Sequence, residues 1–531
     1  MPDTIYESGL SMPSALHSFS YFITSAIVLL LALAFYYGAV SPLGRELAVP
    51  NYELVGTNKG ESFDDSKQRY FTNSREILQE GLSKTGKGFQ VCTPLGPLIV
   101  LKKEFINEIQ RHKHLSFAKN VVRANFTKLP GVGLMAGMGG FRWGGDRIDV
   151  FKDVARIQLT QSLGKITEGL SNETALSLQD YFPPSKDWRK IVFYPSAVKL
   201  VSRLSSYAFL GPVLCRNDEW LDINGDYAVV GIDFIRHLRL WPSMVQPIVQ
   251  YFLPQRRIMR QQELTARRII GKELDKRRLR AAADERAGKP KKTYTDALQW
   301  LQDTMDKTNK RFDIASGVLG MGLGAVHTTS MALTRAMFDL CDNPEWIQPL
   351  RDEVKSALEQ DGGWNKVTLH KMKLMDSVLK ESQRRNPVHF TILTRVAEQD
   401  VTLSHGIHIR KNDMVTATTY DTMMDPEVYP EPERFIGDRF LKLRQIPGNE
   451  NKFQYVTTSS DHIGFGHGEH ACPGRFFAGN ELKIVLAHML MKYEWKFAPG
   501  SRSSNIELAQ DIVPNPSAEM MFRERTPEIQ L

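Results

Sequence analysis

The chain has 531 residues, of which 42% are hydrophobic and 24% charged, with a formal net charge of +8. This composition excludes an intrinsically disordered chain and is sufficient for a large buried core. The cysteines Cys92, Cys215, Cys341 and Cys472 lie far apart, which argues against a disulfide scaffold and a structural zinc site. The densest basic run, residues 256–280, is interspersed with acidic residues, so it indicates a solvated helix rather than an arm that binds nucleic acid.

The N-terminal segment contains an uncharged stretch, residues 19–40, which is long enough to cross a hydrocarbon core of about 30 Å as a helix. The alternative is a cleaved signal peptide, but this requires a basic region before the apolar run, and residues 1–18 contain no Lys or Arg. Arg45 and Lys59 follow the stretch, so the positive-inside rule places the body of the chain in the cytosol. We therefore expect a short luminal N-terminus at 1–18, one transmembrane anchor at 19–40, and a linker at 41–60.

The rest of the chain, residues 61–531, is expected to form a single domain that is mainly α-helical with a small β-sheet region. Residues 88–106 contain β-branched runs broken by Gly and Pro, which predicts a hairpin that leads into a helix. From 146 to 358 the hydrophobic pattern has a period of 3.6 residues, apart from a polar connector at 281–292 that we expect to be an exposed loop. Strands are expected to return only in residues 390–419.

The stretch FGHGEHACPG, residues 465–474, surrounds Cys472 with glycine and proline. Gly466 and Gly468 allow backbone conformations with positive φ, and an amphipathic helix is predicted directly after Gly474. A thiol at a helix N-terminus lies at the positive end of the helix dipole, which lowers its pKa and favours a metal ligand or a nucleophile. A buried cysteine that acts as a small hydrophobic residue is the alternative, although a core position does not need such a loop.

This loop resembles the F-x-x-G-x-x-x-C-x-G signature of the cytochromes P450, the haem-thiolate monooxygenases, through Phe465, Gly468, Cys472 and Gly474. The resemblance implies the cytochrome P450 fold, with heme b as cofactor and Cys472 as the axial ligand of the haem iron. His470 takes the place of the usual Arg of the family, which contacts a haem propionate, and an imidazole can also donate to a carboxylate. A cysteine hydrolase would need a general base beside Cys472, and no usual signature of one accompanies it.

Further motifs resemble elements of the same family. Glu381 and Arg384 match its E-x-x-R pair, and their spacing of three places both side chains on one face of a helix. Arg434, in the stretch PERF, resembles the Arg that joins this pair in a buried network that braces the haem pocket. The resemblance also makes Arg395 and Arg156 candidates for contacts with a haem propionate.

Residues 316–338 are apolar and rich in glycine, which predicts a helix with a kink or with a flat group close to it. A second membrane span is the alternative, but His327 and the hydroxyl residues after it would be poor contacts for lipid. In the family this helix covers the haem with the pattern [AG]-G-x-[DE]-T-[TS], and here Thr328 keeps the threonine while His327 replaces the acid. The Thr328 hydroxyl can relay the protons that O₂ cleavage needs, whereas His327 is expected either to relay protons or to pack.

The resemblance extends to fungal members of secondary metabolism, such as diterpene and ent-kaurene oxidases. It implies an enzyme that inserts one oxygen atom from O₂ into a C–H bond of a lipophilic terpenoid or prenylated alkaloid. Its electrons are expected from NADPH through NADPH-cytochrome P450 reductase, in the endoplasmic reticulum membrane, with the catalytic domain in the cytosol and no nucleic-acid partner. Basic candidates for docking the reductase are Lys152, Lys165 and Lys483.

Substrate contacts are expected from four stretches, which are 123–135, 316–338, 388–393 and 514–518. Two other functions on the same scaffold stay open. One is an isomerase or dehydratase that uses neither O₂ nor a reductase, against which the retention of Thr328 speaks. The other is a membrane protein that binds haem without catalysis, for which a sealed pocket would be diagnostic.

Overall fold

The computed structural model describes most of the chain, namely residues 49–58, 60–127, 129, 150, 152–241, 244–309 and 311–531, together with 25, 28 and 29. The predicted anchor at 19–40 lies outside the described residues apart from those last three, as do residues 1–18 and the first part of the predicted linker. Within the described part of the chain, no helix is both long enough and apolar enough to cross a bilayer.

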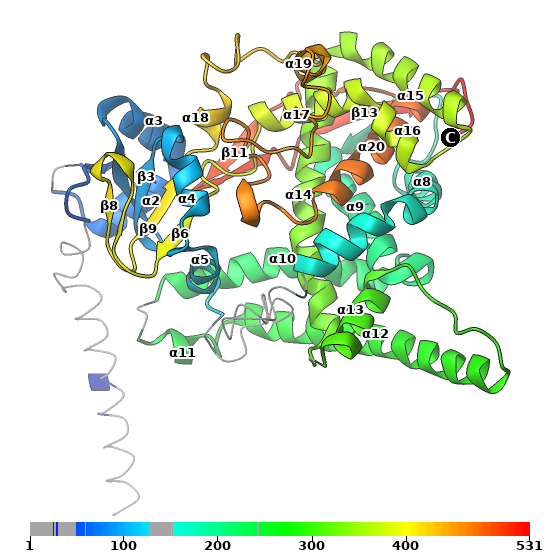
Figure 1. Cartoon of the computed structure of the whole chain (residues 1–531), viewed down its shortest axis with the longest axis horizontal. Helices are drawn as coiled ribbons and strands as arrows, with labels where there is room; N and C mark the ends of the chain where they lie inside the picture. The colour runs from blue at the N-terminus through cyan, green and yellow to red at the C-terminus, as the bar shows by residue number, and fades with distance from the viewer. Residues whose placement is uncertain are drawn as a thin grey trace, which may run out of the picture.

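One long helix, α14 (Ile314–Asp342), organises the helical part of the molecule. The Asp313 side chain caps its N-terminus by accepting a hydrogen bond from the backbone N–H of Ala315 at 3.2 Å. The helices α9 (Phe193–Leu214), α10 (Asp218–Arg239) and α17 (Lys373–Arg385) pack against it, and Figure 1 shows α14 running through the middle of the molecule. Because it lies in the core, the alternative interpretation of 316–338 as a membrane span is wrong.

The glycines of α14 have separate roles. A Cβ at Gly322 would lie 2.0 Å from Oδ1 of Asn224 on α10, so glycine lets these two helices cross closely. A Cβ at Gly324 would meet nothing within 4 Å. The helix continues through both positions without a break, so the predicted kink is absent. At Gly322 the close neighbour is α10, whereas Gly324 leaves space for the flat group that was the alternative prediction.

The remaining helices surround this core. Those before α14 are α2 (Phe63–Thr72), α3 (Ser74–Lys84), α4 (Ile106–Arg111), α5 (Phe117–Ala124), α8 (Thr160–Tyr181), α11 (Gln246–Val249), α12 (Pro254–Arg286) and α13 (Ala297–Thr308). Those after it are α15 (Ile347–Asp361), α16 (Lys366–Lys371), α18 (Tyr420–Met423), α19 (Arg439–Gln445) and α20 (Arg475–Lys492). The last of these, α20, begins three residues after Cys472 and packs against α8, α14 and α15.

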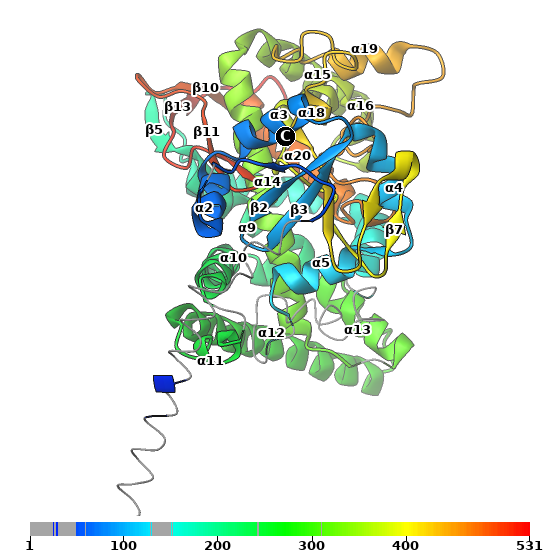
Figure 2. The same ribbon diagram turned by 90° about the vertical axis from the view of Figure 1, so that its left-hand side faces the viewer.

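The largest sheet lies at one end of the molecule, beside α2 and α3 (Figures 1 and 2). Its strands in spatial order are β1 (Leu54–Val55), β2 (Gly88–Thr93), β3 (Gly96–Leu101), β9 (Met414–Ala417), β6 (Arg395–Ala397) and β4 (Leu115–Ser116). The predicted hairpin is confirmed, because β2 and β3 pair antiparallel from Gly88↔Leu101 to Thr93↔Gly96 and α4 follows. Strand β1 lies inside the stretch predicted as linker, residues 41–60, and pairs with β2.

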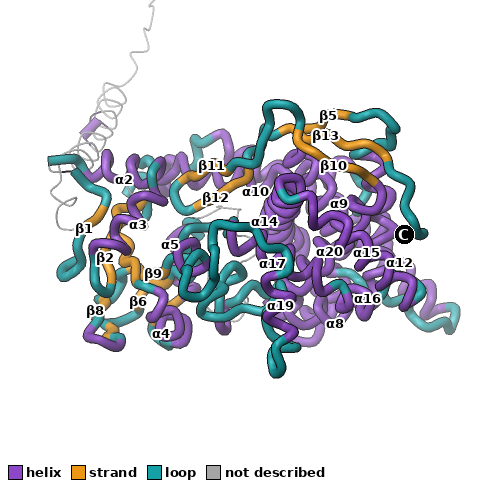
Figure 3. Tube along the Cα trace, turned by 90° about the horizontal axis from the view of Figure 1, so that it is seen from above, coloured by secondary structure: helices purple, strands orange, loops and turns teal. Residues whose placement is uncertain are grey.

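Smaller sheets complete the fold, and Figure 3 shows one of them away from the large sheet. That sheet orders β10 (Tyr493–Phe497), β13 (Glu519–Glu524) and β5 (Arg189–Val192), while β7 (Val401–Thr402) pairs with β8 (His408–Ile409) and β11 (Asn505–Leu508) with β12 (Asp511–Pro514). The prediction that strands return only in 390–419 is therefore wrong, because β10 to β13 follow α20. The prediction of an exposed loop over 281–292 is also wrong in part, because α12 continues to Arg286 before the chain becomes irregular.

Candidate functional site

The cysteine loop, residues 465–474, is closed by its own backbone. The N–H of Cys472 donates to the carbonyl of Phe465 at 2.8 Å, and the N–H of Ala471 donates to the carbonyl of Gly468 at 3.1 Å. Gly466 and Gly468 have φ values of +71° and +75°, which glycine adopts without strain. A Cβ at Gly468 would also lie 1.7 Å from the side-chain oxygen of Gln110, so a larger residue here would strain the backbone and displace the Gln110 side chain.

Cys472 has a free, partly buried thiol just before α20. Burial raises the pKa of this thiol, although the N–H groups of Gly474 and Arg475 and the Arg475 charge act in the opposite direction. The sequence predicted a lowered pKa from the helix terminus, and the difference arises because desolvation outweighs the favourable dipoles. Burial therefore favours the neutral thiol here, and a metal ion would reverse this because it deprotonates a coordinating thiol outright.

The face of α14 that carries Thr328 is bare. Most of this helix is buried, yet Gly324 and Thr328, one turn apart, are both exposed. The Thr328 hydroxyl donates to the carbonyl of Gly324 at 2.8 Å, and its lone pairs stay available as acceptors. A flat group can therefore lie against α14 at Gly324, with the Thr328 hydroxyl beside it.

His327 points to the neighbouring helices. Its Nε2 lies 2.8 Å from the carbonyl oxygen of Gly225 on α10, and its Nδ1 lies 3.3 Å from the hydroxyl of Tyr194 on α9. A carbonyl can only accept, so the proton is assigned to Nε2 and Nδ1 accepts from the phenol. Burial raises the pKa of Tyr194 to about 12, which keeps this donor protonated. Of the two roles expected for His327, these contacts favour packing over proton relay.

Arg395 and His470 both lie against one aromatic ring, that of Phe117. The His470 ring stacks on Phe117 with centroids 5.1 Å apart, and the Arg395 guanidinium lies 5.2 Å from the centroid of the same ring. Burial lowers the pKa of Arg395 to about 10, and burial followed by the Arg395 charge lowers the pKa of His470. Among the described residues no carboxylate lies within 4 Å of Arg395, which donates to the carbonyl of Thr394 at 3.1 Å. A desolvated cation in this position suits an external carboxylate.

Arg156 lies in a π-helical turn, Val154–Leu159, that leads into α8. Its side chain is half exposed, and its Nη2 is 3.5 Å from a carboxylate oxygen of Asp153. It also lies close enough to Arg475 to lower the pKa of that guanidinium, to which burial contributes most. Arg475 itself donates to the carbonyl of Cys472 at 2.8 Å, a contact the sequence analysis missed. The structure therefore places Arg156 near the cysteine loop and gives it no contact with Arg395.

Glu381 and Arg384 form a fully buried ion pair on α17. Two parallel hydrogen bonds join them, at 2.8 Å from Nε and 2.9 Å from Nη2. The third member is Arg439, at the start of α19, whose Nε lies 3.1 and 3.0 Å from the two oxygens of Glu381. The prediction of Arg434 in this role is wrong, because its side chain is 69% exposed and pairs with Glu431. The stretch RFIGDRF repeats Arg-Phe, and the second copy supplies the buried cation.

The structure contradicts one predicted docking residue and leaves one predicted substrate stretch untested. Lys483, a candidate for the reductase-docking surface, is buried, and its ammonium lies 2.6 Å from a carboxylate oxygen of Asp376. It therefore has no place on a docking surface, whereas Lys165 is exposed. The predicted substrate stretch 123–135 lies largely outside the described residues, and Arg123, at its start, donates to the carbonyl of Leu95 at 2.8 Å.

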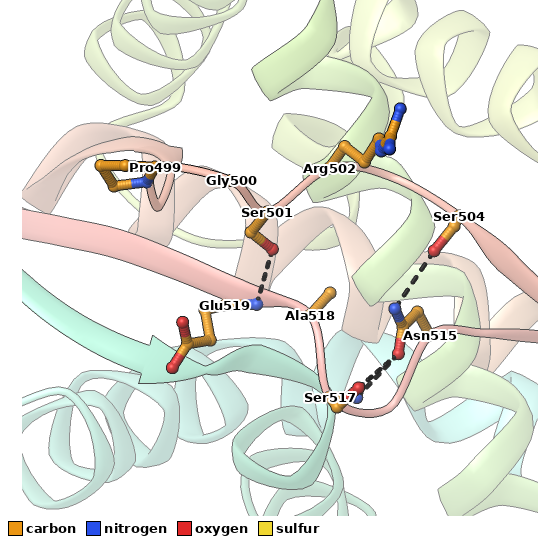
Figure 4. A pocket seen from close by; sticks show the side chains of 9 residues that line it. All are labelled: Pro499, Gly500, Ser501, Arg502, Ser504, Asn515, Ser517, Ala518 and Glu519. Carbon is orange, nitrogen blue, oxygen red and sulfur yellow. Dashed lines mark hydrogen bonds between the residues drawn. The ribbon is translucent and has the colours of Figure 1, made fainter.

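The turn at 514–518 borders a surface cavity of about 420 Å³ (Figure 4). Asn515 donates to the hydroxyl of Ser504 at 3.1 Å and accepts from the hydroxyl of Ser517 at 2.8 Å, so the turn is held by its own polar groups. The cavity has a polar lining that contains neither Cys472 nor Thr328. It is therefore separate from the cysteine loop and the bare face of α14.

Comparisons with known proteins agree with this arrangement. A family model described as Cytochrome P450 matches residues 231–522. The chain is 39% identical to cytochrome P450 monooxygenase 1 of Gibberella fujikuroi, over 83% of this chain and 99% of that protein. It is 36% identical to cytochrome P450 monooxygenase adrA of Penicillium rubens, over 87% of this chain and 89% of that protein. The chain belongs to the cytochrome P450 family.

Solved structures show the same cytochrome P450 fold. The heme domain of cytochrome P450DA superimposes with a TM-score of 0.68 at 15% identity, covering 90% of this chain and 99% of that chain. Retinoic acid bound cyanobacterial CYP120A1 gives a TM-score of 0.64 at 17% identity, covering 90% and 100%. The predicted fold, mainly helical with small sheets, is confirmed, and the protein is a cytochrome P450 monooxygenase.

The site of this cytochrome P450 fits the haem that its family implies. Cys472 offers an iron ligand that desolvation alone would leave protonated, and Gly324 leaves open space on the bare face of α14. Arg395 and His470 offer desolvated donors for the propionates. When bound, haem iron supplies the activation of O₂ that no amino-acid side chain provides.

Proposed function

We propose that this cytochrome P450 inserts one oxygen atom from O₂ into a C–H bond of a lipophilic secondary metabolite, of the terpenoid or prenylated alkaloid type. Electrons would come from NADPH through a flavoprotein reductase. The observation that supports it most is that α20, which directly follows the closed cysteine loop, packs on α14, whose bare face carries the Thr328 hydroxyl. The retention of Thr328 speaks against an isomerase or dehydratase, which does not need a proton relay to O₂.

In this proposal each residue of the site has one task. The Cys472 thiolate holds the haem iron, and Arg475 holds the Cys472 carbonyl in place. Arg395 and His470 would bind the propionates, which would give the desolvated Arg395 cation a charge partner and the His470 imidazole an acceptor for its N–H. The Thr328 hydroxyl, which can both donate and accept a hydrogen bond, would relay protons within the site.

The proposed substrate class rests on the walls of the site. The segment 388–393 is mostly apolar and lies between α17 and β6, and the bare part of α14 presents Gly324 and Ala325. Apolar walls select ligands by shape and buried area. A lipophilic substrate fits these walls better than a charged one.

We also propose that the chain is anchored in the endoplasmic reticulum membrane through residues 19–40, with the single catalytic domain, 61–531, in the cytosol. A second feature supports contact with a bilayer. The stretch from the end of α10 to the start of α12 exposes large apolar side chains, namely Leu240, Trp241, Met244, Ile248, Tyr251 and Phe252. Exposed apolar clusters of this kind are sites of membrane or protein contact.

The test is expression of the full chain in a host that carries a flavoprotein reductase. The reduced, carbonyl-bound wild type should give the absorption of a thiolate-ligated haem, and Cys472→Ser should lose it. Feeding terpenoid precursors should give hydroxylated products that require NADPH, as detected by mass spectrometry. Products that form without NADPH would show an isomerase or dehydratase, and a thiolate signature that survives Cys472→Ser would exclude Cys472 as the ligand.

A further inference from the structure

Arg335 is a buried cation on α14 that the proposed chemistry does not use. It follows Thr328 by seven residues, or about 10.5 Å along the helix axis. Its side chain is almost inaccessible to solvent, and its guanidinium donates to three backbone carbonyls, those of Asn386, Pro387 (2.9 Å) and Ile512. Two of its nitrogens thus hold two separate segments of the chain.

The two segments are also joined to each other. The N–H of Ile512, in β12, donates to the carbonyl of Val388 at 2.9 Å, and the N–H of Phe390 donates to the carbonyl of Gln510 at 2.8 Å. The stretch 386–393 contains the apolar wall of the proposed substrate site. Together with 510–514 it forms a two-stranded unit that Arg335 ties to the helix carrying Thr328.

This unit borders the cysteine loop. Arg335 lines a cavity of about 20 Å³ together with Val388 and Tyr455. The Tyr455 ring packs edge-on against Phe465, the first residue of the cysteine loop, with centroids 5.1 Å apart. Arg335 therefore lies between the proposed substrate wall and the proposed haem site.

The chemistry of Arg335 suits holding carbonyls. Among the described residues no carboxylate lies within 4 Å of its guanidinium, so its donors are directed to backbone oxygens. Burial lowers its pKa to about 10, which still leaves it charged at neutral pH. A guanidinium presents several N–H groups in a fixed plane, whereas a lysine ammonium is a compact charge that cannot span carbonyls of two segments in this geometry.

We propose that Arg335 is a positioning residue that holds segments 386–393 and 510–514 at a fixed distance from Thr328 and so determines which substrates the site accepts. This inference rests on the proposed function, because it assigns those segments to the substrate wall. Arg335 touches neither Cys472 nor Thr328 in this role. Its loss should change the shape of the site while leaving the iron ligand in place.

The experiment uses the haem-loaded full chain and the variants Arg335→Gln and Arg335→Lys. Arg335→Lys keeps the positive charge, so it can be measured even if Arg335→Gln does not fold. The control is Arg351→Lys, because Arg351 is also buried and also donates to backbone carbonyls, those of Leu490 (2.9 Å) and Tyr493 (3.2 Å). Unlike Arg335, it also pairs with the Glu494 carboxylate at 3.1 Å. Its carbonyl partners belong to another part of the fold. These lie at the end of α20 and the start of β10 rather than in the proposed substrate wall.

Two azole probes report the shape of the site through the haem absorption. Imidazole needs only the iron, whereas clotrimazole also needs the surrounding walls. We expect Arg335→Lys to weaken the binding affinity for clotrimazole at least tenfold while the affinity for imidazole changes less than twofold. Arg351→Lys should leave both affinities unchanged. Equal changes for both probes, or none, would overturn the inference.

Hydrogen–deuterium exchange tests whether Arg335 holds the two segments in place, a role that we call the clamp, without reference to the haem. Amides in 386–393 and 510–514 should exchange about tenfold faster in Arg335→Lys than in wild type and remain protected in Arg351→Lys. Unchanged protection of both segments would overturn the clamp. If wild type binds neither azole at an iron centre but the exchange result holds, the proposed function fails while the clamp stands.

Discussion

His327 ties three helices together at the place where the cytochrome P450 pattern has an acid. Its Nε2–H donates to Gly225 on α10, and its Nδ1 accepts from Tyr194 on α9. A carboxylate at this position would face the Gly225 carbonyl, and two acceptors cannot form a hydrogen bond. The histidine is therefore matched to its neighbours, and restoring the family residue should harm this chain.

We expect His327→Asp to lower the free energy of unfolding by about 1 to 3 kcal/mol, because it leaves the half-buried Gly225 carbonyl without its donor and places a carboxylate beside it. His327→Asn keeps an N–H donor and should cost less. Tyr194→Phe, which removes only the donor to Nδ1, serves as the control and should cost about 1 kcal/mol. Urea unfolding measures all three, and an Asp variant as stable as wild type would show that the Gly225 hydrogen bond does not form.

Arg439 and Arg434 form a natural pair for testing the network around Glu381. Arg439→Ala leaves the Glu381 carboxylate with one cation in a fully buried site, so it should cost about 3 to 5 kcal/mol and reduce haem content. Arg434→Ala removes an exposed side chain and should stay within about 0.5 kcal/mol of wild type. Thermal unfolding and haem absorption measure both variants. Equal losses for the two would contradict the geometry of the network.

Helix α20 carries a buried acid, Glu481, in addition to Glu381 on α17. Its side chain is inaccessible to solvent, one oxygen accepts from the hydroxyl of Ser205 at 3.0 Å, and the other has no partner among the described residues. Burial raises its pKa to about 8. The folded chain therefore binds this proton more tightly than the unfolded chain, and the stability it contributes is present at low pH and declines as pH rises towards 8.

We expect Glu481→Gln to remove this decline. Between pH 7 and pH 8 wild type should lose about 1 kcal/mol more stability than the variant, since one pKa unit corresponds to about 1.4 kcal/mol. Urea unfolding at the two pH values gives the difference. His488, on the same helix, has a pKa lowered from 6.5 to about 3 by burial. Its effect on stability therefore falls mainly between these two pH values, and it is the same in wild type and in the variant. Parallel pH profiles would show that Glu481 is ionised in the fold.

Local patterns predicted the elements well where the chain's own neighbours decide the structure. The hairpin of β2 and β3, the central α14 and the cysteine loop ahead of α20 all follow from turn residues and periodicity within a few positions. Tertiary partners decided the rest. Strands β10 and β13 become strands because they pair with each other, and β13 also pairs with the distant β5.

The same reasoning explains which site residues were missed. Arg335 has partners 51 and 177 residues away, so nothing near it in the sequence marks it as a clamp. Arg439 carried a visible signal, the second Arg-Phe of RFIGDRF, but the choice between two similar motifs depends on which arginine faces Glu381. Tyr194 lies 133 residues before His327, and only the packing of α9 on α14 brings them together.

The exposed apolar stretch between α10 and α12 lies well before the cysteine loop in the sequence, and α11, which belongs to it, lies at the lower left of the molecule in Figure 1. Leu240, Met244 and Phe252 are each at least 80% exposed. Burying a large apolar side chain contributes about 1.5 to 3 kcal/mol, so three together can hold a domain at a bilayer surface. This contact would act in addition to the proposed anchor at 19–40.

The contribution of this stretch can be separated from that of the anchor by comparing the full chain with a form that lacks residues 1–48. In the shortened form, replacing Leu240, Met244 and Phe252 by serine should reduce sedimentation with phosphatidylcholine vesicles at least tenfold, because each replacement removes apolar area from the contact. Val213 and Leu279, which are 69% and 72% exposed on other surfaces, provide the matched control, and serine there should leave binding unchanged. Equal losses in both sets would mean that binding depends on general surface hydrophobicity. Unchanged binding of the triple variant would place the membrane contact elsewhere on the molecule.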